Sequence, residues 1–505
     1  MEKKYHEFMK EITSDELFEG LLGHGMFNEK LPPFLTSESF FNYCIKGGKV
    51  PSGTPRDYVR FNGIRNNDVP RQYAIPTPFA YFDLCKLLSD NWDKICEHFE
   101  TNTSNKEYKI SRTHIRKRKK TKSIFKMNYE NWKEDGMVET EILIGKRYMV
   151  SADISNCFPS IYTHSISWAI AGKEVAKANK NNKHLWYNKV DKFVRDMKNG
   201  ETHGLLIGPH ASNVLSEIIL TSIDKNLSKW DYIRHIDDYN CFVPTYEDAQ
   251  KFLLDLNREL AVFGLVLNHK KTEIVELPTG IKEPWVFRLK APYLLIEKGQ
   301  KTNKNEKKLR YPTIRSYIEM SINLMKENGM NSAILNYAIK VLSKCNFTKN
   351  AKNYFLKTVF HLSLIYPYLI PLIDEYIFCK LSVSKDDISK ISNLIFERGM
   401  EERNYEAVSY SLYFALKYDF EIDALDADEM LKSEDCVAML VSHHLFEKIG
   451  DNQSAKKLKD YAVKLSKKQY TMESNWLFVY EVLSTSELEE PWKSVKTCGT
   501  SFFRI

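Results

Sequence analysis

The sequence predicts an α+β protein in two parts, with a mixed domain in residues 1–295 and an all-helical domain in residues 296–505. Between residues 147 and 290, short apolar segments rich in β-branched residues alternate with helical patterns. A polar, lysine-rich connector follows at 298–312. Beyond it, apolar residues recur every three or four positions, which is typical of packed antiparallel helices or of a helical repeat.

The composition is that of a globular cytosolic protein. The chain has 505 residues, of which 43% are hydrophobic and 13% aromatic, so it is long enough for two or three domains. The mean hydropathy of −0.42 and the lack of an apolar run of ~18 residues argue against a membrane span. The charged N-terminus argues against export. Nine scattered cysteines without a CxxC pair are typical of reduced thiols, not of disulfides or a zinc site.

The elements before residue 147 are a helix and a basic segment. Residues 76–100 are predicted to form one helix entered through prolines. Residues 106–126 carry ten Lys/Arg against one Glu, an excess larger than the net charge of +7 for the whole chain. Such a cluster attracts phosphates, and we expect a basic β-hairpin here. A solvated basic loop is the alternative.

The elements from residue 147 onward predict an antiparallel sheet with helices packed on it. Two of the expected strands meet an acid where they end or turn. The expected elements are a strand at 147–158 ending at Asp153, a helix after the turn at 158–163, a Gly/Pro loop and helix at 204–227, two short strands at 232–243, a helix at 246–264 and a strand-like segment at 265–277.

The stretch RHIDDYNCF at 234–242 places Asp237 and Asp238 side by side between apolar arms. Two like charges about 4 Å apart repel by about 4 kcal/mol at an effective dielectric constant of about 20, and something must offset that cost. If this hairpin lies beside the strand that ends at Asp153, three carboxylates converge. Such a set can hold two Mg²⁺ ions, which activate a hydroxyl nucleophile and stabilise a pyrophosphate leaving group. A solvated acidic turn and a strand-end cap are the alternatives.

Taken together, these residues resemble the palm of a reverse transcriptase over roughly residues 60–290. DISNCFPSI resembles the first acidic motif, with Asp153 and the backbone carbonyl of Ile154 as metal ligands, and HIDDY resembles the YxDD box. The resemblance implies a fingers region at about 55–145, a palm at about 146–295, and two Mg²⁺ ions or, alternatively, Mn²⁺. The resemblance also implies that Phe158 is a steric gate that excludes a 2′-hydroxyl, and that Gly208, Pro209 and Ser212 form the loop under the nucleotide. It places Lys271, with Lys270 as the alternative, near the pyrophosphate, and it implies residues 284–290 as the hairpin that grips the primer. The triphosphate is expected to contact one of three arginines: Arg112, Arg116 and Arg118.

A finer resemblance is to the bacterial abortive-infection reverse transcriptases of the AbiK type. It is carried by YTHSISW at 162–168, by the helix with Glu217 after a loop that lacks glutamine, and by an all-helical C-terminal part where other polymerases have a thumb. The resemblance implies a cytoplasmic bacterial homo-oligomer in phage defence that joins dNTPs without a template. It also implies a tyrosine of the protein as primer, so that single-stranded DNA stays attached. Among 28 tyrosines the primer is not identifiable, and Tyr5 is one candidate.

Two departures from other reverse transcriptases bear on templating. His235 stands where the YxDD box has tyrosine, and Ile207 stands where the nucleotide-pocket loop has glutamine. Isoleucine cannot donate the hydrogen bonds that support a template–nucleotide pair, which favours untemplated synthesis. The alternatives are an RNA-templated reverse transcriptase, a catalytically idle nucleic-acid-binding scaffold and, remotely, a nucleotidyl cyclase, although nothing in the sequence resembles a GGDEF loop.

Overall fold

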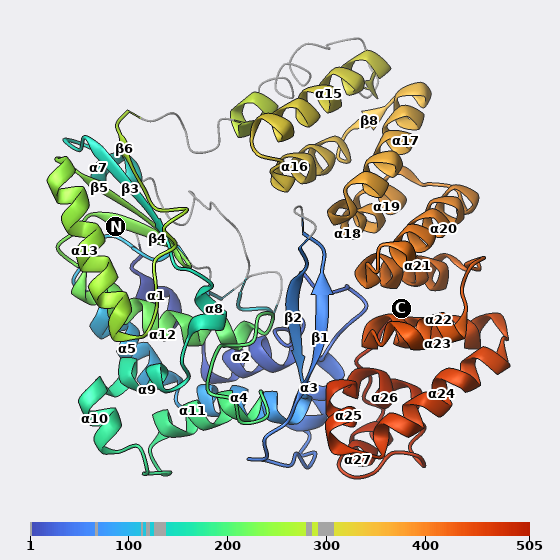
Figure 1. The fold of residues 1–505 in the computed structure, drawn as a ribbon, viewed down its shortest axis with the longest axis horizontal. Helices are drawn as coiled ribbons and strands as arrows, with labels where there is room; N and C mark the ends of the chain where they lie inside the picture. Colours follow the sequence, from blue (N-terminus) through green and yellow to red (C-terminus); the bar gives the residue numbers. More distant parts are fainter. Residues whose placement is uncertain are drawn as a thin grey trace. The chain divides into compact units, whose positions relative to one another are not determined.

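The computed structural model describes residues 3–65, 69–112, 115–117, 122–125, 138–278, 285–290 and 308–505. The chain divides into two compact units. The first unit comprises residues 1–60, 73–279 and 465–504, and the second comprises 61–72 and 280–464 together with Ile505. Figure 1 shows the order of the elements along the chain. No helix among the described residues is long and apolar enough to cross a membrane.

The first unit combines helices with a four-stranded sheet. Its helices are α1 (Tyr5–Lys10), α2 (Ser14–Phe18), the π-helix η1 (Glu19–Gly23), α3 (Glu38–Ile45), α4 (Pro78–Asp90), α5 (Trp92–Thr103), α7 (Val138–Ile142), α8 (Cys157–Ser160), α9 (His164–Ala171), α10 (Lys173–Ala178), α11 (Trp186–Asp196), α12 (His210–Asn226), α13 (Tyr246–Val262), α25 (Gln469–Ser474), α26 (Trp476–Val482) and α27 (Trp492–Thr497). Its strands are β3 (Tyr148–Asp153), β4 (Tyr232–His235), β5 (Asp238–Val243) and β6 (Glu273–Glu276). The strands β1 (Tyr58–Gly63) and β2 (Arg71–Pro76) pair with each other, and each has residues in both units.

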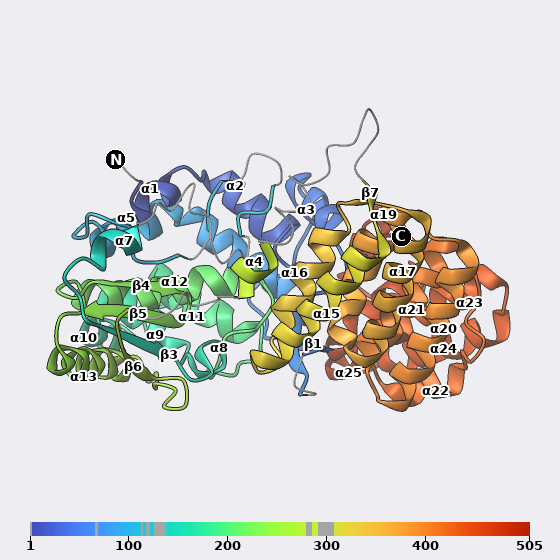
Figure 2. The ribbon, with the colours of Figure 1, turned by 90° about the horizontal axis from the view of Figure 1, so that it is seen from above.

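The sheet has the order β4-β5-β3-β6 and is antiparallel throughout, as predicted. Figure 2 shows α13 beside this sheet. Because side chains alternate across a strand, the register separates two faces. The pairs Met149↔Phe242 and Asp153↔Asp238 share one face, and the packing of Met149 and Phe242 with α7 covers part of it. The ring of Tyr232 contacts Phe252 of α13, which covers the opposite face.

The basic segment pairs with the sheet and with itself. Ser111 forms a parallel bridge to Arg234 of β4, and Ile115 forms an antiparallel bridge to Phe125. The amide of Arg116 donates to the carbonyl of Ile124 at 2.8 Å. The described residues of this segment therefore have the pairing of the expected hairpin, while 113–114, 118–121 and 126 lie outside the described residues.

Two local predictions need correction. The helix expected over 76–100 is divided into α4 and α5, because Asn91 leaves the helical conformation and its side-chain amide caps the carbonyl of Leu87 at 3.0 Å. The primer hairpin implied at 284–290 is not a hairpin in its described part. Residues 285–290 are helical, and Pro284 lies outside the described residues.

Residues 465–504 belong to the first unit, whereas the sequence predicted one helical domain over 296–505. The cause is an aromatic cluster. Trp476 of α26 stacks on Trp492 of α27 with ring centroids 5.7 Å apart, and Trp492 contacts Phe79 of α4 at 4.5 Å. Trp476 also donates its indole N–H to the carbonyl of Ile75 at 3.3 Å. Burying such large rings together stabilises the return of the chain.

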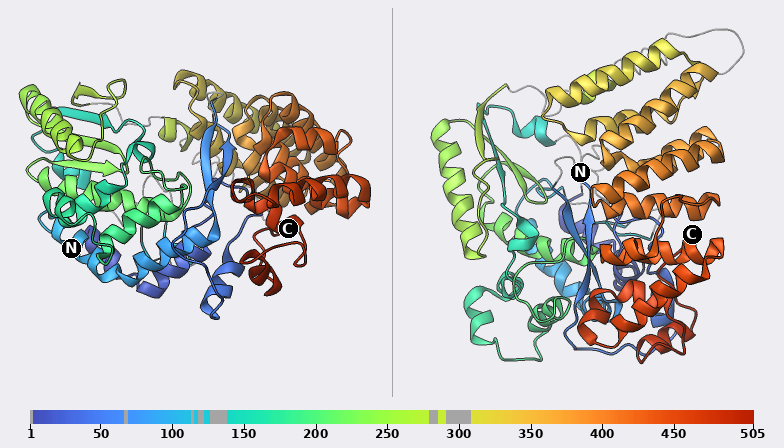
Figure 3. Two further views of the ribbon diagram at one scale, coloured as in Figure 1. Left: turned by 60° about the horizontal axis from the view of Figure 1, so that its bottom comes forward. Right: turned by 45° about the vertical axis from the view of Figure 1, so that its right-hand side comes forward.

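The second unit is mainly helical. Its elements are β7 (Lys308–Leu309), α15 (Tyr311–Glu327), α16 (Ser332–Leu342), β8 (Asn346–Phe347), α17 (Lys349–Ile365), the 3₁₀-helix η2 (Pro367–Leu369), α18 (Ile370–Ile373), the π-helix η3 (Asp374–Phe378), α19 (Cys379–Leu381), α20 (Lys385–Glu401), α21 (Tyr405–Tyr418), α22 (Ala427–Ser433), α23 (Cys436–Ile449) and α24 (Asn452–Ser466), the last of which crosses the unit boundary. Helices pack mostly on near neighbours in sequence, such as α20 on α21 and α21 on α23. Figure 3 shows this succession.

Candidate active site

The three predicted acids meet at one end of the sheet. Asp153 ends β3, Asp238 begins β5, and the two residues are direct partners in the antiparallel register. Asp237 lies in the turn before Asp238, and its carbonyl accepts a 3.1 Å hydrogen bond from the amide of Ile154. One carboxylate oxygen from each acid lies within 4.8 Å of the others. The hairpin therefore brings together groups that are 84 residues apart in sequence.

The charges of these acids are crowded. Partial burial, a hydrogen bond to Asp153 and the charges of Asp237 and Asp153 together raise the pKa of Asp238 to about 7, while the ammonium of Lys271 lowers it. Asp238 is exposed and Asp237 is half-buried, whereas Asp153 is buried. The donor set consists of carboxylate oxygens, the ligands that Mg²⁺ and Mn²⁺ prefer. A divalent cation fits this set because it would remove the repulsion that otherwise favours a proton on Asp238.

Two side chains from the segment after α13 contact Asp153. Lys271 places its ammonium 3.2 Å from Asp153 Oδ2, while its stem is largely exposed. Asn268 donates its side-chain amide to the same oxygen at 2.8 Å and its backbone N–H to the Asp153 carbonyl at 2.7 Å. The sequence analysis predicted roles for the lysines of LNHKKT but not for Asn268. An asparagine two residues before Lys270 is typical of an Asx turn, and in the structure Asn268 Oδ1 accepts from the amide of Lys270 at 3.2 Å.

The aromatic residue after the first acid lies in α8. Phe158 is half-buried, and its carbonyl accepts a 2.8 Å hydrogen bond from the amide of Leu205. The turn into α8 uses Asn156 in the left-handed region, with φ +46°. Asn156 follows Asp153 by three residues, so Phe158 lies close to this acid in the sequence.

The Gly/Pro loop is tied to β2 and to an N-terminal residue. Gly208 has φ +136°, and a Cβ at this position would lie 3.0 Å from the carbonyl oxygen of Ala74. The amide of Ala74 donates to the Ile207 carbonyl at 2.8 Å, and the Asn28 side chain donates to the Gly208 carbonyl at 3.0 Å. Only glycine combines this φ with so close an approach. Pro209 is buried at the start of α12.

Three other candidates are buried. Ser212 is 1% exposed on α12, and its buried hydroxyl has no hydrogen-bond partner among the described residues. Arg112 is also buried, with its backbone paired to Arg234. Tyr5 is 2% exposed. Burial is the main cause that raises the pKa of its phenol, and the negative charge of Glu217 raises it further. Arg116 is half-buried, and Arg118 lies outside the described residues.

The residues of YTHSISW make contacts typical of a structural role. His164 places Nδ1 2.7 Å from Asp191 Oδ2 of α11. The ring of Trp168 lies 5.9 Å from that of Tyr162, and the ammonium of Lys173 lies 4.5 Å from the Trp168 ring. His235 is half-buried and pairs with Asp238 in the β4–β5 register.

A second group with metal-ligand chemistry lies on α23 and comprises His443, His444 and Glu447. The Nδ1 atoms of the histidines lie 3.5 and 3.6 Å from Glu447 Oε2. All three residues come from one helix, and the histidines are adjacent. Ion pairing along the helix accounts for this group without a cation.

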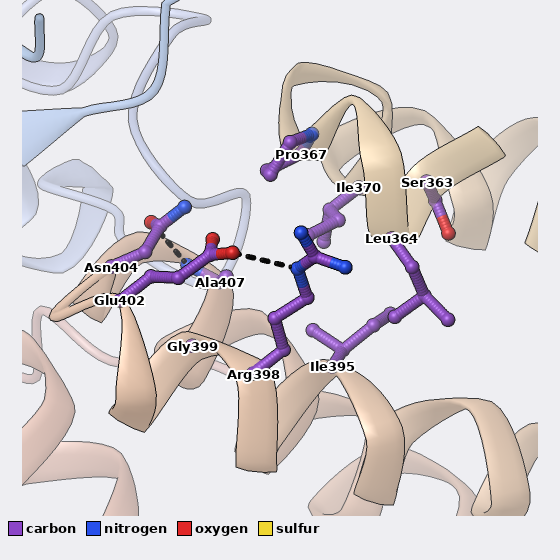
Figure 4. A pocket seen from close by; sticks show the side chains of 10 residues that line it. All are labelled: Ser363, Leu364, Pro367, Ile370, Ile395, Arg398, Gly399, Glu402, Asn404 and Ala407. Carbon is purple, nitrogen blue, oxygen red and sulfur yellow. Dashed lines mark hydrogen bonds and ion pairs between the residues drawn. The ribbon is translucent and has the colours of Figure 1, made fainter. Parts of the chain in front are cut away.

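A pocket in the second unit is separate from the acids in sequence and in its chemistry. It encloses about 200 Å³, part of it open to solvent. Arg398 and Glu402 both line the pocket, and the guanidinium of Arg398 donates to the carboxylate of Glu402 (Figure 4) at 2.7 Å. The lining residues are Ser363, Leu364, Pro367, Ile370, Ile395, Arg398, Gly399, Glu402, Asn404 and Ala407. This lining offers no acid cluster and no set of cations for a phosphate.

Comparison with protein families identifies the region that carries the acids. Residues 92–312 match the family model described as "Reverse transcriptase (RNA-dependent DNA polymerase)". The protein contains a reverse transcriptase-like domain. This matched region includes Asp153, Asp237 and Asp238. Domains of this kind generally use divalent metals, in agreement with the donor set of the acids.

Among solved structures, the chain is similar to telomerase from Candida albicans in complex with a fragment of telomeric RNA. The two share 9% sequence identity with a TM-score of 0.29, over 70% of this chain and 64% of the telomerase chain. The chain thus matches somewhat less than two thirds of that protein's length. No curated protein matches the sequence.

Proposed function

We propose that this protein is a DNA polymerase that joins dNTPs without a template, uses one of its own tyrosines as primer and acts in abortive-infection defence against phage. The observation that carries the proposal is the convergence of Asp153, Asp237 and Asp238 within a reverse transcriptase-like domain. Sites of nucleotidyl transfer need such acids, because two divalent cations activate the attacking hydroxyl and stabilise the pyrophosphate.

In this proposal the chain's own residues orient the reactants. The three carboxylates, with the carbonyl of Ile154, hold the cations. Lys271 lies beside Asp153 and is exposed enough to meet the leaving pyrophosphate. Phe158 lies under the sugar, where its ring leaves no room for a 2′-hydroxyl. Gly208, Pro209 and Ser212 form the floor of the nucleotide site, and Arg112 or Arg116 of the basic segment meets the triphosphate.

The untemplated part of the proposal is supported by Ile207. Its side chain has no hydrogen-bonding group, and its carbonyl already accepts from Ala74. The loop therefore lacks the side-chain donor that the resemblance places beside a template–nucleotide pair. The proposal also includes a homo-oligomer and a cytoplasmic location, which the resemblance implies, and a helical repeat in the C-terminal part of the chain.

The decisive experiment incubates the purified protein with Mg²⁺ and labelled dNTPs in the absence of nucleic acid. A denaturing gel is run with and without protease. We expect label that migrates with the protein and is released by protease, and we expect Asp237→Asn to lose it. Asp255→Asn on α13, which removes a carboxylate that pairs with Lys229 and Trp230, is the matched control and should keep it.

The same assay separates the alternatives. Label that appears only when an RNA template and a primer are added would replace the proposal with an RNA-templated reverse transcriptase. No incorporation under either condition would favour a nucleic-acid-binding scaffold. The defence role is tested by phage plating on bacteria that express the protein or its Asp237→Asn variant, and equal plating on both would contradict it.

A further inference from the structure

A fully buried ion cluster lies directly behind the turn that carries two of the acids. Its centre is Arg234 of β4, which is 0% exposed, and its partners are Glu217 and Asp224 of α12, at 0% and 2%. Buried charges are rare unless every group is paired and hydrogen-bonded. Glu217 belongs to the helix that carries the AbiK-type resemblance, whereas no role is implied for Arg234 or Asp224.

All five N–H donors of the Arg234 guanidinium are used. Nε donates to Asp224 Oδ1 at 3.1 Å, Nη2 donates to Asp224 Oδ2 at 2.6 Å and to Glu217 Oε2 at 3.2 Å, and Nη1 donates to Glu217 Oε1 at 2.8 Å and to the carbonyl of Ile236 at 2.8 Å. Further hydrogen bonds fix the two carboxylates. Ser111 donates to Glu217 at 2.9 Å, and the phenol of Tyr232 donates to Asp224 at 2.9 Å. The guanidinium is thus held in one orientation, with one donor left for the turn.

The residue that receives this donor is strained. Ile236 has φ +58°, a left-handed conformation that is a genuine outlier for a β-branched side chain. Such conformations persist only where the surroundings hold them, and they gather at functional sites. The next residue is Asp237, whose carbonyl accepts from Ile154 beside Asp153. The conformation of Ile236 therefore decides whether the turn places Asp237 and Asp238 against the end of β3.

We propose that Arg234 is a positioning residue for the metal-binding acids, because its guanidinium, fixed by Glu217 and Asp224, holds the Ile236 carbonyl and so keeps the turn in the strained conformation that presents Asp237 and Asp238. This inference rests on the proposed function, since it concerns the same acids. Arginine is required for this role. A lysine has three donors and no planar fork, so it cannot engage both carboxylates and the turn together.

The test measures Mn²⁺ binding by electron paramagnetic resonance, which needs no polymerase activity. The wild-type protein is compared with Asp237→Asn to establish that binding uses the acids. The main variant combines Arg234→Met, Glu217→Gln and Asp224→Asn, which removes the whole cluster and leaves no charge buried alone. Circular dichroism and cooperative urea unfolding verify that it folds. We expect its Mn²⁺ affinity to fall at least about tenfold.

A second pair of variants tests whether the effect passes through Ile236. Glycine adopts positive φ without a steric cost, whereas alanine keeps the Cβ that disfavours it. Added to the triple variant, Ile236→Gly should recover Mn²⁺ affinity by at least about threefold, and Ile236→Ala should recover less. If the triple variant does not unfold cooperatively, Arg234→Lys replaces it, with the same expected direction of loss and of recovery by glycine.

Each outcome decides the question. Wild-type affinity in a folded variant, or equal recovery by glycine and alanine, would overturn the positioning role while the proposed function stands. A wild-type protein without Asp237-dependent Mn²⁺ binding would overturn the proposed function and this inference with it. A loss in the cluster variant that glycine relieves more than alanine does supports both.

Discussion

The same kind of ion pair occurs in both units of this protein with different consequences. Arg234 and Glu217 lie 2.8 Å apart in the first unit and are fully buried. Arg398 of α20 and Glu402, just after this helix in the second unit, lie 2.7 Å apart and are nearly half exposed. The distances are almost equal. The exposed pair is screened by water, and such pairs contribute about 0–1 kcal/mol. The buried pair has lost its hydration and depends on its protein partners. Removing one of its charges is therefore expected to lower the free energy of unfolding much more than removing a charge of the exposed pair.

The two units also differ in where backbone strain occurs. Ile236 and Asn156 adopt positive φ on either side of the acids. In the second unit, positive φ is found just after helices end, at Gly450 and also at the non-glycine residues Met330, Ser382, Arg403, Asp419 and Glu434. At Ile236 positive φ coincides with crowded charge, whereas in the helical unit it accompanies the ends of helices. Four experiments test these differences.

The largest effect is expected at the acids themselves. Asp237→Asn should lower the rate of dNTP incorporation by about 10⁴-fold, which corresponds to about 5.5 kcal/mol at the transition state. The reason is the loss of one ligand from a set of three. Single-turnover incorporation of labelled dNTP measures it, with Asp255→Asn as the control of equal charge change. A loss below about tenfold would contradict a catalytic role for Asp237.

The next effect compares the two ion pairs directly. Arg234→Met leaves Glu217 and Asp224 buried without their cation, and it should lower the free energy of unfolding by about 3–5 kcal/mol. Arg398→Met should change that free energy by no more than about 0.5 kcal/mol. Urea unfolding followed by circular dichroism measures both. Equal effects in the two units would refute the assignment of the difference to burial.

A smaller effect is expected for sugar selection. Phe158→Ala opens the space under the sugar and should lower the preference for dNTPs over rNTPs by about 10–100-fold, or about 1–3 kcal/mol. Competition between a labelled dNTP and the matching rNTP measures the ratio. Phe263→Ala, which truncates a buried ring after α13, controls for a general loss of packing. An unchanged ratio in Phe158→Ala would remove the steric-gate assignment.

The smallest effect concerns the stability of the metal-free protein. A carboxyl whose folded pKa is raised destabilises the folded state, and for Asp238 this penalty grows as the pH rises from about 4 towards about 7. Asp238→Asn removes the penalty. We expect a gain of about 1 kcal/mol at pH 8 after allowing for solvent screening, and a smaller gain at pH 5. Urea unfolding in the presence of a chelator measures this, and a gain that falls with rising pH would be the contrary result.

Much of the fold was predictable because local patterns carried it. The strand ending at Asp153, the hairpin around Asp237 and Asp238, and the helix ended by Gly264 each have a period or a turn residue that is visible in the sequence. The break at Asn91 was not, because a single asparagine inside a helical pattern is usually tolerated. The return of α25–α27 was also invisible, since the partners of Trp476 and Trp492 lie some 400 residues earlier.

The candidate site divides in the same way. The acids and Lys271 were found because adjacent charges and a family motif mark them. Asn268, Arg234 and Asp224 were missed because an asparagine in a loop, or a single charge on a strand or helix, usually faces water. Ser212 and Arg112 fitted the motifs, yet they are buried. Exposure depends on which elements cover a residue, and no local pattern records that.

Local patterns in the sequence predicted the kinds of element, the three acids and the resemblance of the surrounding region to a reverse transcriptase. The burial of Arg234 with all its donors used, the positive φ of Ile236, and the contacts of Asn268 and Lys271 with Asp153 are visible only in the folded structure. The difference arises from the sequence distance over which each kind of interaction acts. Periodicity and turn chemistry act over a few residues, whereas burial and charge pairing depend on contacts between segments that are far apart in the chain.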